Sequence, residues 1–88
     1  MFVSIDISMY PLDENYTASI TEFINRLDAN SKLKVERNRM STQVFGDYHA
    51  VMAEVSQEML SALEQLPTTV FVLKLIGADR STIQEPSR

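Results

Sequence analysis

The sequence contains no cysteine and only two glycines among its 88 residues. Without cysteine the chain forms neither a disulfide framework nor a thiolate metal site. Gly46 and Gly77 lie far apart, so a glycine-rich phosphate-binding loop is excluded as well. A chain of this length makes one domain with a modest hydrophobic core. We therefore expect association with another copy to contribute to its stability.

Basic charge and long apolar runs are also scarce. The net charge is −4 and the sequence pI is near 4.8, which argues against a nucleic-acid or anionic-membrane surface. No apolar stretch approaches the ~20 residues of a membrane span. The start, Met1-Phe2-Val3, lacks the basic and long apolar segments of a signal peptide. The expected location is the cytoplasm.

Hydrophobic periodicity predicts six segments of regular structure. Apolar residues alternate with polar ones in strands at 2–10, 32–38 and 41–46, and a fourth strand at 68–76 is apolar throughout. Three- and four-residue spacing predicts helices at 14–29 and 48–65. Asp47 is a good N-cap for the second helix, and Pro67 marks its end.

The order β-α-β-β-α-β is that of the ferredoxin-like α+β fold. This fold has a four-stranded antiparallel sheet with two helices on one face, and right-handed crossovers enforce that arrangement. We expect a single domain over residues 1–79 and a flexible tail over residues 80–88.

One sheet face is predicted to stay free of helices. The helix-facing residues of the first strand are Val3, Ile5, Ile7 and Met9, which leaves Phe2, Ser4, Asp6, Ser8 and Tyr10 on the open face. Ser41, Gln43 and Phe45 are expected to join them, together with either Val70 and Val72 or Phe71, Leu73 and Leu75. A face with this much apolar surface is usually covered. We therefore predict a homodimer or homotetramer that packs through the sheet faces.

Asp6 is the charged residue on the open face of the first strand. A carboxylate under partial cover needs a partner. The candidates are an arginine such as Arg37 or Arg39, a symmetry copy, or a cationic ligand. The simpler interpretation is a salt bridge or a solvated position.

Three segments carry a family resemblance. Ser8-Met9-Tyr10-Pro11-Leu12, Met40-Ser41-Thr42-Gln43-Val44-Phe45-Gly46 and Gly77-Ala78-Asp79 are similar to segments of the YkoF-like, thiamine-binding family of small ferredoxin-like proteins. The similarity covers about residues 3–79. It implies that the chain binds thiamine or its hydroxymethylpyrimidine part without chemistry, and that it self-associates. The residues that match the family are Ser8, Tyr10, Ser41, Thr42 and Gly46. Asp6 does not match, so its role rests on the physical argument above.

The residue chemistry is compatible with such a ligand. Serine and threonine hydroxyls both donate and accept hydrogen bonds, as an aminopyrimidine requires, and Gln43 can do either. Tyr10 offers a flat ring with a polar tip, and an aromatic face or Asp6 would favour a thiazolium cation. The predicted ligand-binding residues are Asp6, Ser8, Tyr10, Ser41, Thr42 and Gln43.

Simpler roles are also possible for these residues. Ser41 and Thr42 fit an ordinary hairpin edge, and Tyr10 fits an oligomer interface. His49 is expected to be exposed, and one histidine without cysteine is a poor metal site, so we expect neither a metal nor a cofactor. The alternative function is a regulatory or structural oligomeric module without thiamine binding. An enzyme is disfavoured because no Ser-His-Asp arrangement can be recognised.

Overall fold

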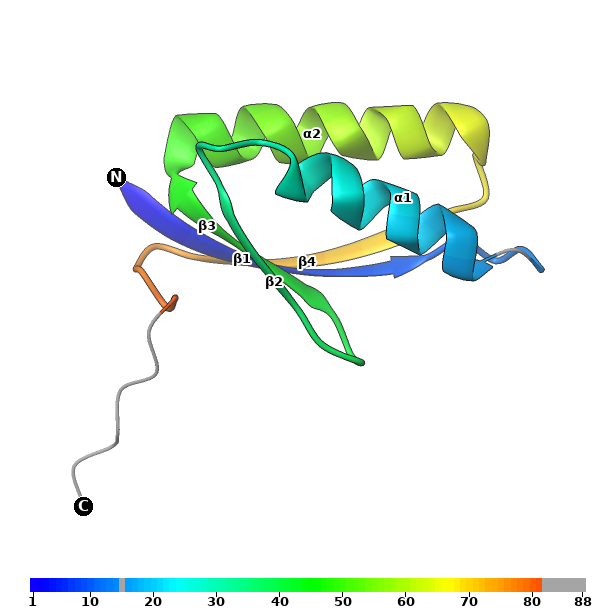
Figure 1. Cartoon of the computed structure of the whole chain (residues 1–88), viewed down its shortest axis with the longest axis horizontal. Coiled ribbons are helices and arrows are strands. Elements are labelled where there is room, and N and C mark those ends of the chain that lie inside the picture. The colour runs from blue at the N-terminus through cyan, green and yellow to red at the C-terminus, as the bar shows by residue number, and fades with distance from the viewer. Residues whose placement is uncertain (15, 82–88) are drawn as a thin grey trace, which may run out of the picture.

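The computed structural model describes residues 1–14 and 16–81. Its elements follow the predicted order (Figure 1): β1 (Phe2–Tyr10), α1 (Tyr16–Asp28), β2 (Lys34–Arg37), β3 (Thr42–Asp47), α2 (Tyr48–Gln65) and β4 (Val70–Ile76). Most of the predicted tail, residues 82–88, lies outside the described residues, as does Asn15, one of the expected capping residues. None of the described helices is long and apolar enough to cross a membrane.

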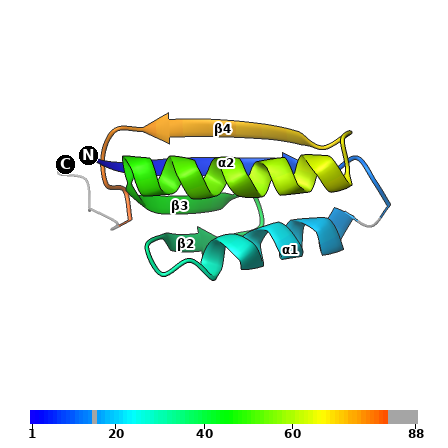
Figure 2. The same cartoon turned by 90° about the horizontal axis from the view of Figure 1, so that it is seen from above.

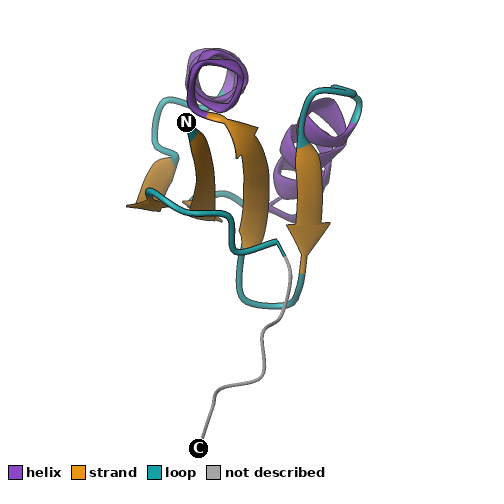
Figure 3. Cartoon of the chain, turned by 90° about the vertical axis from the view of Figure 1, so that its left-hand side faces the viewer, coloured by secondary structure: helices purple, strands orange, loops and turns teal. Residues whose placement is uncertain are grey.

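The four strands form one antiparallel sheet in the order β2-β3-β1-β4. Both helices lie on the same side of this sheet (Figure 3). The two central strands are therefore β1 and β3, and the predicted ferredoxin-like architecture is confirmed.

The core lies between the sheet and the helices. In β1, Val3, Ile5 and Ile7 are almost fully buried, and their register partners in β3 are Gly46, Val44 and Thr42. The helices add their own apolar stripes to the core, namely Phe23, Ile24 and Leu27 from α1 and Val51, Val55 and Ala62 from α2. Spacing of three and four residues places each of these sets on one face of its helix.

Local interactions fix the ends and the pairing of the helices. The Asp47 side chain accepts a hydrogen bond from the backbone N–H of His49 at 3.1 Å, so the predicted N-cap is confirmed. Between the helices, Arg26 Nε lies 3.0 Å from Glu58 Oε1, and Arg26 also contacts Glu22 at 2.9 Å. This ion pair defines the side of α2 that faces α1.

The sheet register settles which residues of β4 share the open face. Ser8 pairs with Val72 and Asp6 pairs with Lys74, so the even-numbered residues of β4 lie on the open face. Phe71, Leu73 and Leu75 lie on the helix side. Sequence could not decide between these sets because β4 is apolar in both registers.

The segment after β4 crosses one end of the open face. The Ser4 hydroxyl donates to the carbonyl of Ala78 at 2.7 Å and accepts from the backbone N–H of Arg80 at 2.8 Å. Further across, Lys34 Nζ lies 3.5 Å from the carbonyl oxygen of Ser81. Ser4 and Phe45 are only 4% exposed, although both belong to the helix-free face. Residues 78–81 thus form a strap that leaves the other end of this face bare.

Candidate ligand site

The turn between β2 and β3 is built around Asn38. The side-chain oxygen of Asn38 accepts hydrogen bonds from the backbone N–H groups of Met40 at 2.7 Å and Ser41 at 3.0 Å. The backbone N–H of Asn38 donates to the Ser41 carbonyl at 3.1 Å. Such an asparagine turn is a local, sequence-encoded structure. It holds Arg39 and Met40 above the end of β1, and Met40 is 85% exposed.

A groove lies between this turn, the end of β1 and the first turns of α1. Its inner part is a cavity of about 110 Å³ lined by Ile7, Met9, Ile20, Phe23, Ile24, Asn38, Arg39, Met40, Ser41 and Thr42. Its outer part is a hollow of about 390 Å³ lined by Met9, Tyr10, Pro11, Leu12, Asp13, Tyr16, Ile20, Arg39 and Met40. The two parts share Met9, Ile20, Arg39 and Met40, so we treat them as one feature, the hairpin groove.

The hairpin groove combines apolar walls with a few polar groups. The Thr42 residue at its inner end is 6% exposed, and its hydroxyl makes no hydrogen bond with any residue in the described part of the chain. Tyr10 and Tyr16 line the outer hollow, where Asp13 and Arg39 supply charges of opposite sign. A concave apolar surface with few polar groups is the usual form of a small-molecule site.

Backbone strain occurs at the outer wall of the groove. Leu12 has a φ of 56°, in the left-handed region, and its side chain is exposed. Residues other than glycine adopt this conformation at a cost of about 1–2 kcal/mol. Such strain concentrates at functional sites. It directs the chain from β1 around the hollow toward α1.

A polar cluster lies on the opposite side of the sheet, at the open face. The Ser41 hydroxyl donates to Asp6 Oδ1 at 2.6 Å, and Gln43 Nε2 donates to the same oxygen at 2.8 Å. Gln43 Nε2 also lies 2.7 Å from Ser41 Oγ. The other carboxylate oxygen of Asp6 lies 3.6 Å from Lys74 Nζ. Asp6, Ser41, Gln43 and Lys74 form what we name the Asp6 cluster.

The charge of Asp6 is stabilised by these contacts. The hydrogen bonds from Ser41 and then Gln43 lower the pKa of the Asp6 carboxyl below its ordinary value of 3.8, and the positive charge of Lys74 acts in the same direction. Partial burial opposes this shift. Asp6 is therefore ionised at neutral pH.

The structure divides the six predicted site residues between two sides of the sheet. Thr42 and Tyr10 line the hairpin groove, whereas Asp6 and Gln43 belong to the Asp6 cluster. Ser41 touches both, because its hydroxyl reaches Asp6 and the residue also lines the inner cavity. Ser8 lies half-buried on the open face, opposite Val72 in the register, and does not line the groove.

Two residues near these features, Lys74 and Tyr16, were not predicted from the sequence. Arg37 and Arg39 were among the partners considered for Asp6, but the register places Lys74 directly opposite it, and the salt bridge of the simpler interpretation forms with this lysine. Knowing the β4 register would have revealed this pair. Tyr16, at the start of α1, also lines the groove, and no local pattern distinguishes it from other exposed aromatic residues.

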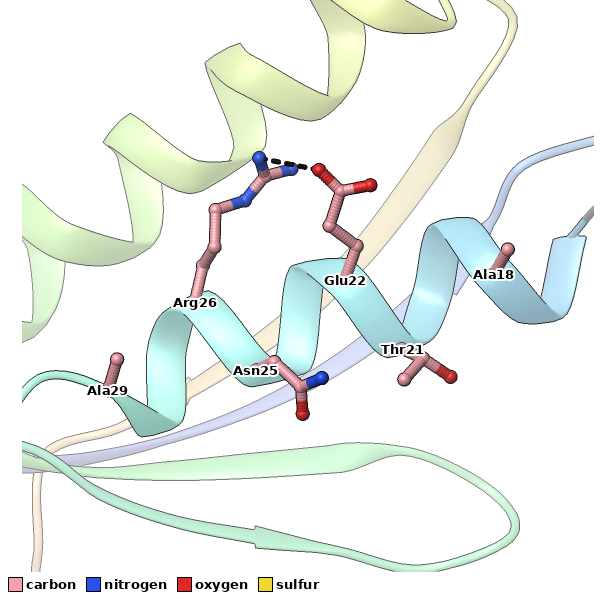
Figure 4. A pocket seen from close by; sticks show the side chains of 6 residues that line it. All are labelled: Ala18, Thr21, Glu22, Asn25, Arg26 and Ala29. Carbon is pink, nitrogen blue, oxygen red and sulfur yellow. Dashed lines mark ion pairs between the residues drawn. The ribbon is translucent and has the colours of Figure 1, made fainter.

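Another hollow lies elsewhere, on the outer surface of α1. It measures about 570 Å³ and is lined only by residues of this helix and its end, namely Ala18, Thr21, Glu22, Asn25, Arg26 and Ala29. Figure 4 shows that several of these side chains point away from one another and that Glu22 and Arg26 pair together. Because no second element closes it, this surface is a weaker candidate than the hairpin groove.

Comparison with known proteins identifies the family. The profile of the YKOF-related family matches residues 2–75, which span all six elements. The chain belongs to the YKOF-related family. No curated protein matches the chain.

Solved structures share the fold of this YKOF-related protein. Protein SP2199 from Streptococcus pneumoniae has a TM-score of 0.82 at 18% identity, covering 94% of this chain and 93% of that one. TM0486 from Thermotoga maritima, assigned provisionally to thiamine biosynthesis or salvage, has a TM-score of 0.77 at 19% identity and covers 96% and 90%. MJ1052 from Methanocaldococcus jannascii has a TM-score of 0.75 at 22% identity and covers 90% and 82%.

Proposed function

We propose that this protein binds thiamine or its hydroxymethylpyrimidine part in the hairpin groove and leaves it chemically unchanged. The proposal rests on one observation, which is that two separate sequence segments line the same groove. Residues 9–12 and 40–42, which belong to the two motifs that resemble the thiamine-binding family, line one groove although about 30 residues of chain separate them. Membership of the YKOF-related family and the thiamine-related assignment of TM0486 support the same ligand class.

The chemistry of the groove suits a flat heteroaromatic ring. Its apolar lining, with Met9, Ile20 and Met40 shared by both parts, would cover the ring faces. The free hydroxyl of Thr42 would serve a ring nitrogen or an exocyclic amine, because it can accept or donate. The rings of Tyr10 and Tyr16 would favour the thiazolium cation of thiamine at the outer end.

Calorimetric titration with thiamine, hydroxymethylpyrimidine and an unrelated organic cation tests the proposal. We expect saturable heat with at least one of the first two and none with the cation. Thr42→Val keeps the side-chain shape and removes one hydrogen bond, worth about 1 kcal/mol, so the affinity should fall about fivefold. Thr21→Val, on the exposed surface of α1, is the control and should bind as the unmodified protein does.

A ligand present at about 100 times its Kd should also raise the free energy of unfolding by ~2.7 kcal/mol. If millimolar thiamine and hydroxymethylpyrimidine give neither heat nor a thermal shift, the binding proposal is wrong. The alternative role as a regulatory or structural module would then be favoured by a stable oligomer. Mass spectrometry of the incubated ligand tests the absence of turnover, since an unchanged mass is expected.

We also propose that the bare end of the open sheet face packs against a second copy. Val70 and Tyr10, which pair across β4 and β1, are 46% and 52% exposed, and Val72 beside them is 53% exposed. The strap covers the opposite end of the face. Tyr10 also lines the hairpin groove, so this packing would lie next to the bound ligand.

A further inference from the structure

Met40 is an exposed methionine on the wall of the hairpin groove. It is 85% exposed, and it lines both the inner cavity and the outer hollow. Met9, Met52 and Met59, by contrast, are partly buried and pack against the core. Met1 is also exposed, at 76%. Figure 2 shows that the N-terminus lies at the opposite end of the molecule from the loop between β1 and α1, which borders the outer hollow. Met40 is therefore a solvent-accessible thioether at the groove.

The chain has no cysteine, so its thioethers are the sulfur groups open to two-electron oxidation. The sulfur atom attacks one oxygen of hydrogen peroxide, an S–O bond forms and the O–O bond breaks. The departing hydroxide takes the proton of the new S–OH group and leaves as water. Sulfur loses two electrons and peroxide gains them. Because susceptibility follows exposure, Met40 should react before the partly buried methionines.

The turn that carries Met40 does not depend on the methionine side chain. The Asn38 side-chain oxygen holds the backbone N–H groups of Met40 and Ser41, at 2.7 and 3.0 Å. Oxidation of the sulfur changes neither contact, and an exposed side chain contributes little to the core. A sulfoxide at Met40 should therefore leave the fold intact, whereas sulfoxides inside a core disrupt it.

A sulfoxide at Met40 would instead change the lining of the groove. Met9, Ile20 and Met40 are the apolar residues shared by its two parts. Oxidation turns one of these three apolar side chains into a polar, chiral one. Arg39 lines both parts as well, and its N–H groups are donors that the new oxygen would attract away from the ligand.

We propose that Met40 is an oxidation site that sets the affinity of the hairpin groove for its ligand. The inference rests on the proposed function, because it concerns the same groove and the same ligand. The thioether of Met40 covers one face of the bound ring, and its sulfoxide does not. Loss of a sulfur–aromatic contact corresponds to a fall in affinity of about two- to tenfold. Methionine sulfoxide reductases restore the thioether, so the change is reversible.

Limited treatment with hydrogen peroxide, followed by peptide mass spectrometry, gives the order of oxidation. We expect Met40 to gain one oxygen atom before Met9, Met52 and Met59 do. Calorimetric titration with thiamine and with hydroxymethylpyrimidine then compares treated and untreated protein. The affinity should fall about two- to tenfold on treatment, while the midpoint of urea unfolding stays the same.

Met40→Leu is the matched variant, because leucine is apolar and cannot be oxidised. Met1 stays exposed in this variant, so it reports the effect of oxidation away from the groove. Whatever affinity Met40→Leu has, peroxide should not change it. Met40→Gln, which places a polar side chain at the same position without peroxide, should bind more weakly than Met40→Leu.

The outcomes separate this inference from the proposed function. If neither thiamine nor hydroxymethylpyrimidine binds the untreated protein, the proposed function is wrong and the inference fails with it. If they bind equally well before and after Met40 is oxidised, only the inference is wrong. The same holds if peroxide weakens binding by Met40→Leu as much as by the unmodified protein, or if the partly buried methionines react before Met40.

Discussion

Asp6 is the charged residue of β1, and its ionisation links the open face to the stability of the fold. Hydrogen bonds from Ser41 and Gln43 lower its pKa in the folded state below 3.8. A carboxyl group whose pKa is lowered on folding contributes its full stabilisation at pH values above the pKa of the unfolded state. This stabilisation is lost as the pH falls from the unfolded pKa through the folded pKa, because the protonated carboxyl group no longer gains from the hydrogen-bond donors.

This linkage predicts a pH-dependent effect of Ser41→Ala. At pH 7 the substitution removes a hydrogen bond to a charged group, so the free energy of unfolding should fall by about 1–2 kcal/mol. The difference from the unmodified protein should shrink below pH 4, where Asp6 becomes protonated. Urea unfolding at pH 7 and pH 3 measures both values. The hydroxyl of Ser56 donates to the Ala53 carbonyl, so Ser56→Ala should show no such pH dependence. An equal loss at both pH values for Ser41→Ala would contradict this role of Asp6.

The sequence predicted the sheet face of single residues better than the way they group together. Alternation correctly placed Ser41 and Gln43 on the face of Asp6. It could not show that a groove opens on the helix side, because that groove depends on the distance between α1 and the turn at Asn38. The six predicted residues therefore looked like one patch, while the sheet separates them.

At the scale of elements, Gly46 lies where β3 passes close to α2. A Cβ atom at this position would lie 3.1 Å from Val51 Cγ2 and 3.3 Å from the carbonyl oxygen of Lys32. Both distances are tighter than ordinary van der Waals contact. A larger residue would have to push the helix or the loop before β2 away from the strand.

We therefore expect Gly46→Ala to lower the free energy of unfolding by about 1–3 kcal/mol, the usual cost of overpacking. Gly77→Ala is the matched control. Its added Cβ would meet the end of the flexible Met1 side chain, which can move aside cheaply. Chemical denaturation of both variants measures the difference. Similar losses of unfolding free energy at the two glycines would show that the close contact between β3 and α2 does not cause the destabilisation.

Element order was predictable because each element has its own local signal. Asp47 begins α2 as expected, and this helix spans the predicted residues 48–65. Strand ends were less certain, and β2 is shorter than the predicted 32–38. The face of β4 was not predictable, since its alternation is masked by apolar residues on both sides. Only pairing with β1, a contact between residues far apart in sequence, decides that face.

At the scale of the whole molecule, the strap makes the open face asymmetric. Ser4 and Phe45 are covered at one end, while Tyr10, Val70 and Val72 are exposed at the other. Two copies that pack through this face must therefore meet over the bare end, where Ser8 lies on a central strand. The ligand groove opens beside the same end, because Tyr10 belongs to both surfaces. Ligand binding and face packing would then be coupled, and each would strengthen or weaken the other by the same factor.

Ser8→Lys tests this face packing. A lysine in the middle of the bare end would be buried by face packing, which is costly for a charge. If the open faces pack together, light scattering should show a larger mass for the unmodified protein than for Ser8→Lys. Ser56→Lys, on the exposed surface of α2, should leave the mass unchanged. An unchanged mass for Ser8→Lys, with its circular dichroism intact, would mean that the open faces do not pack together.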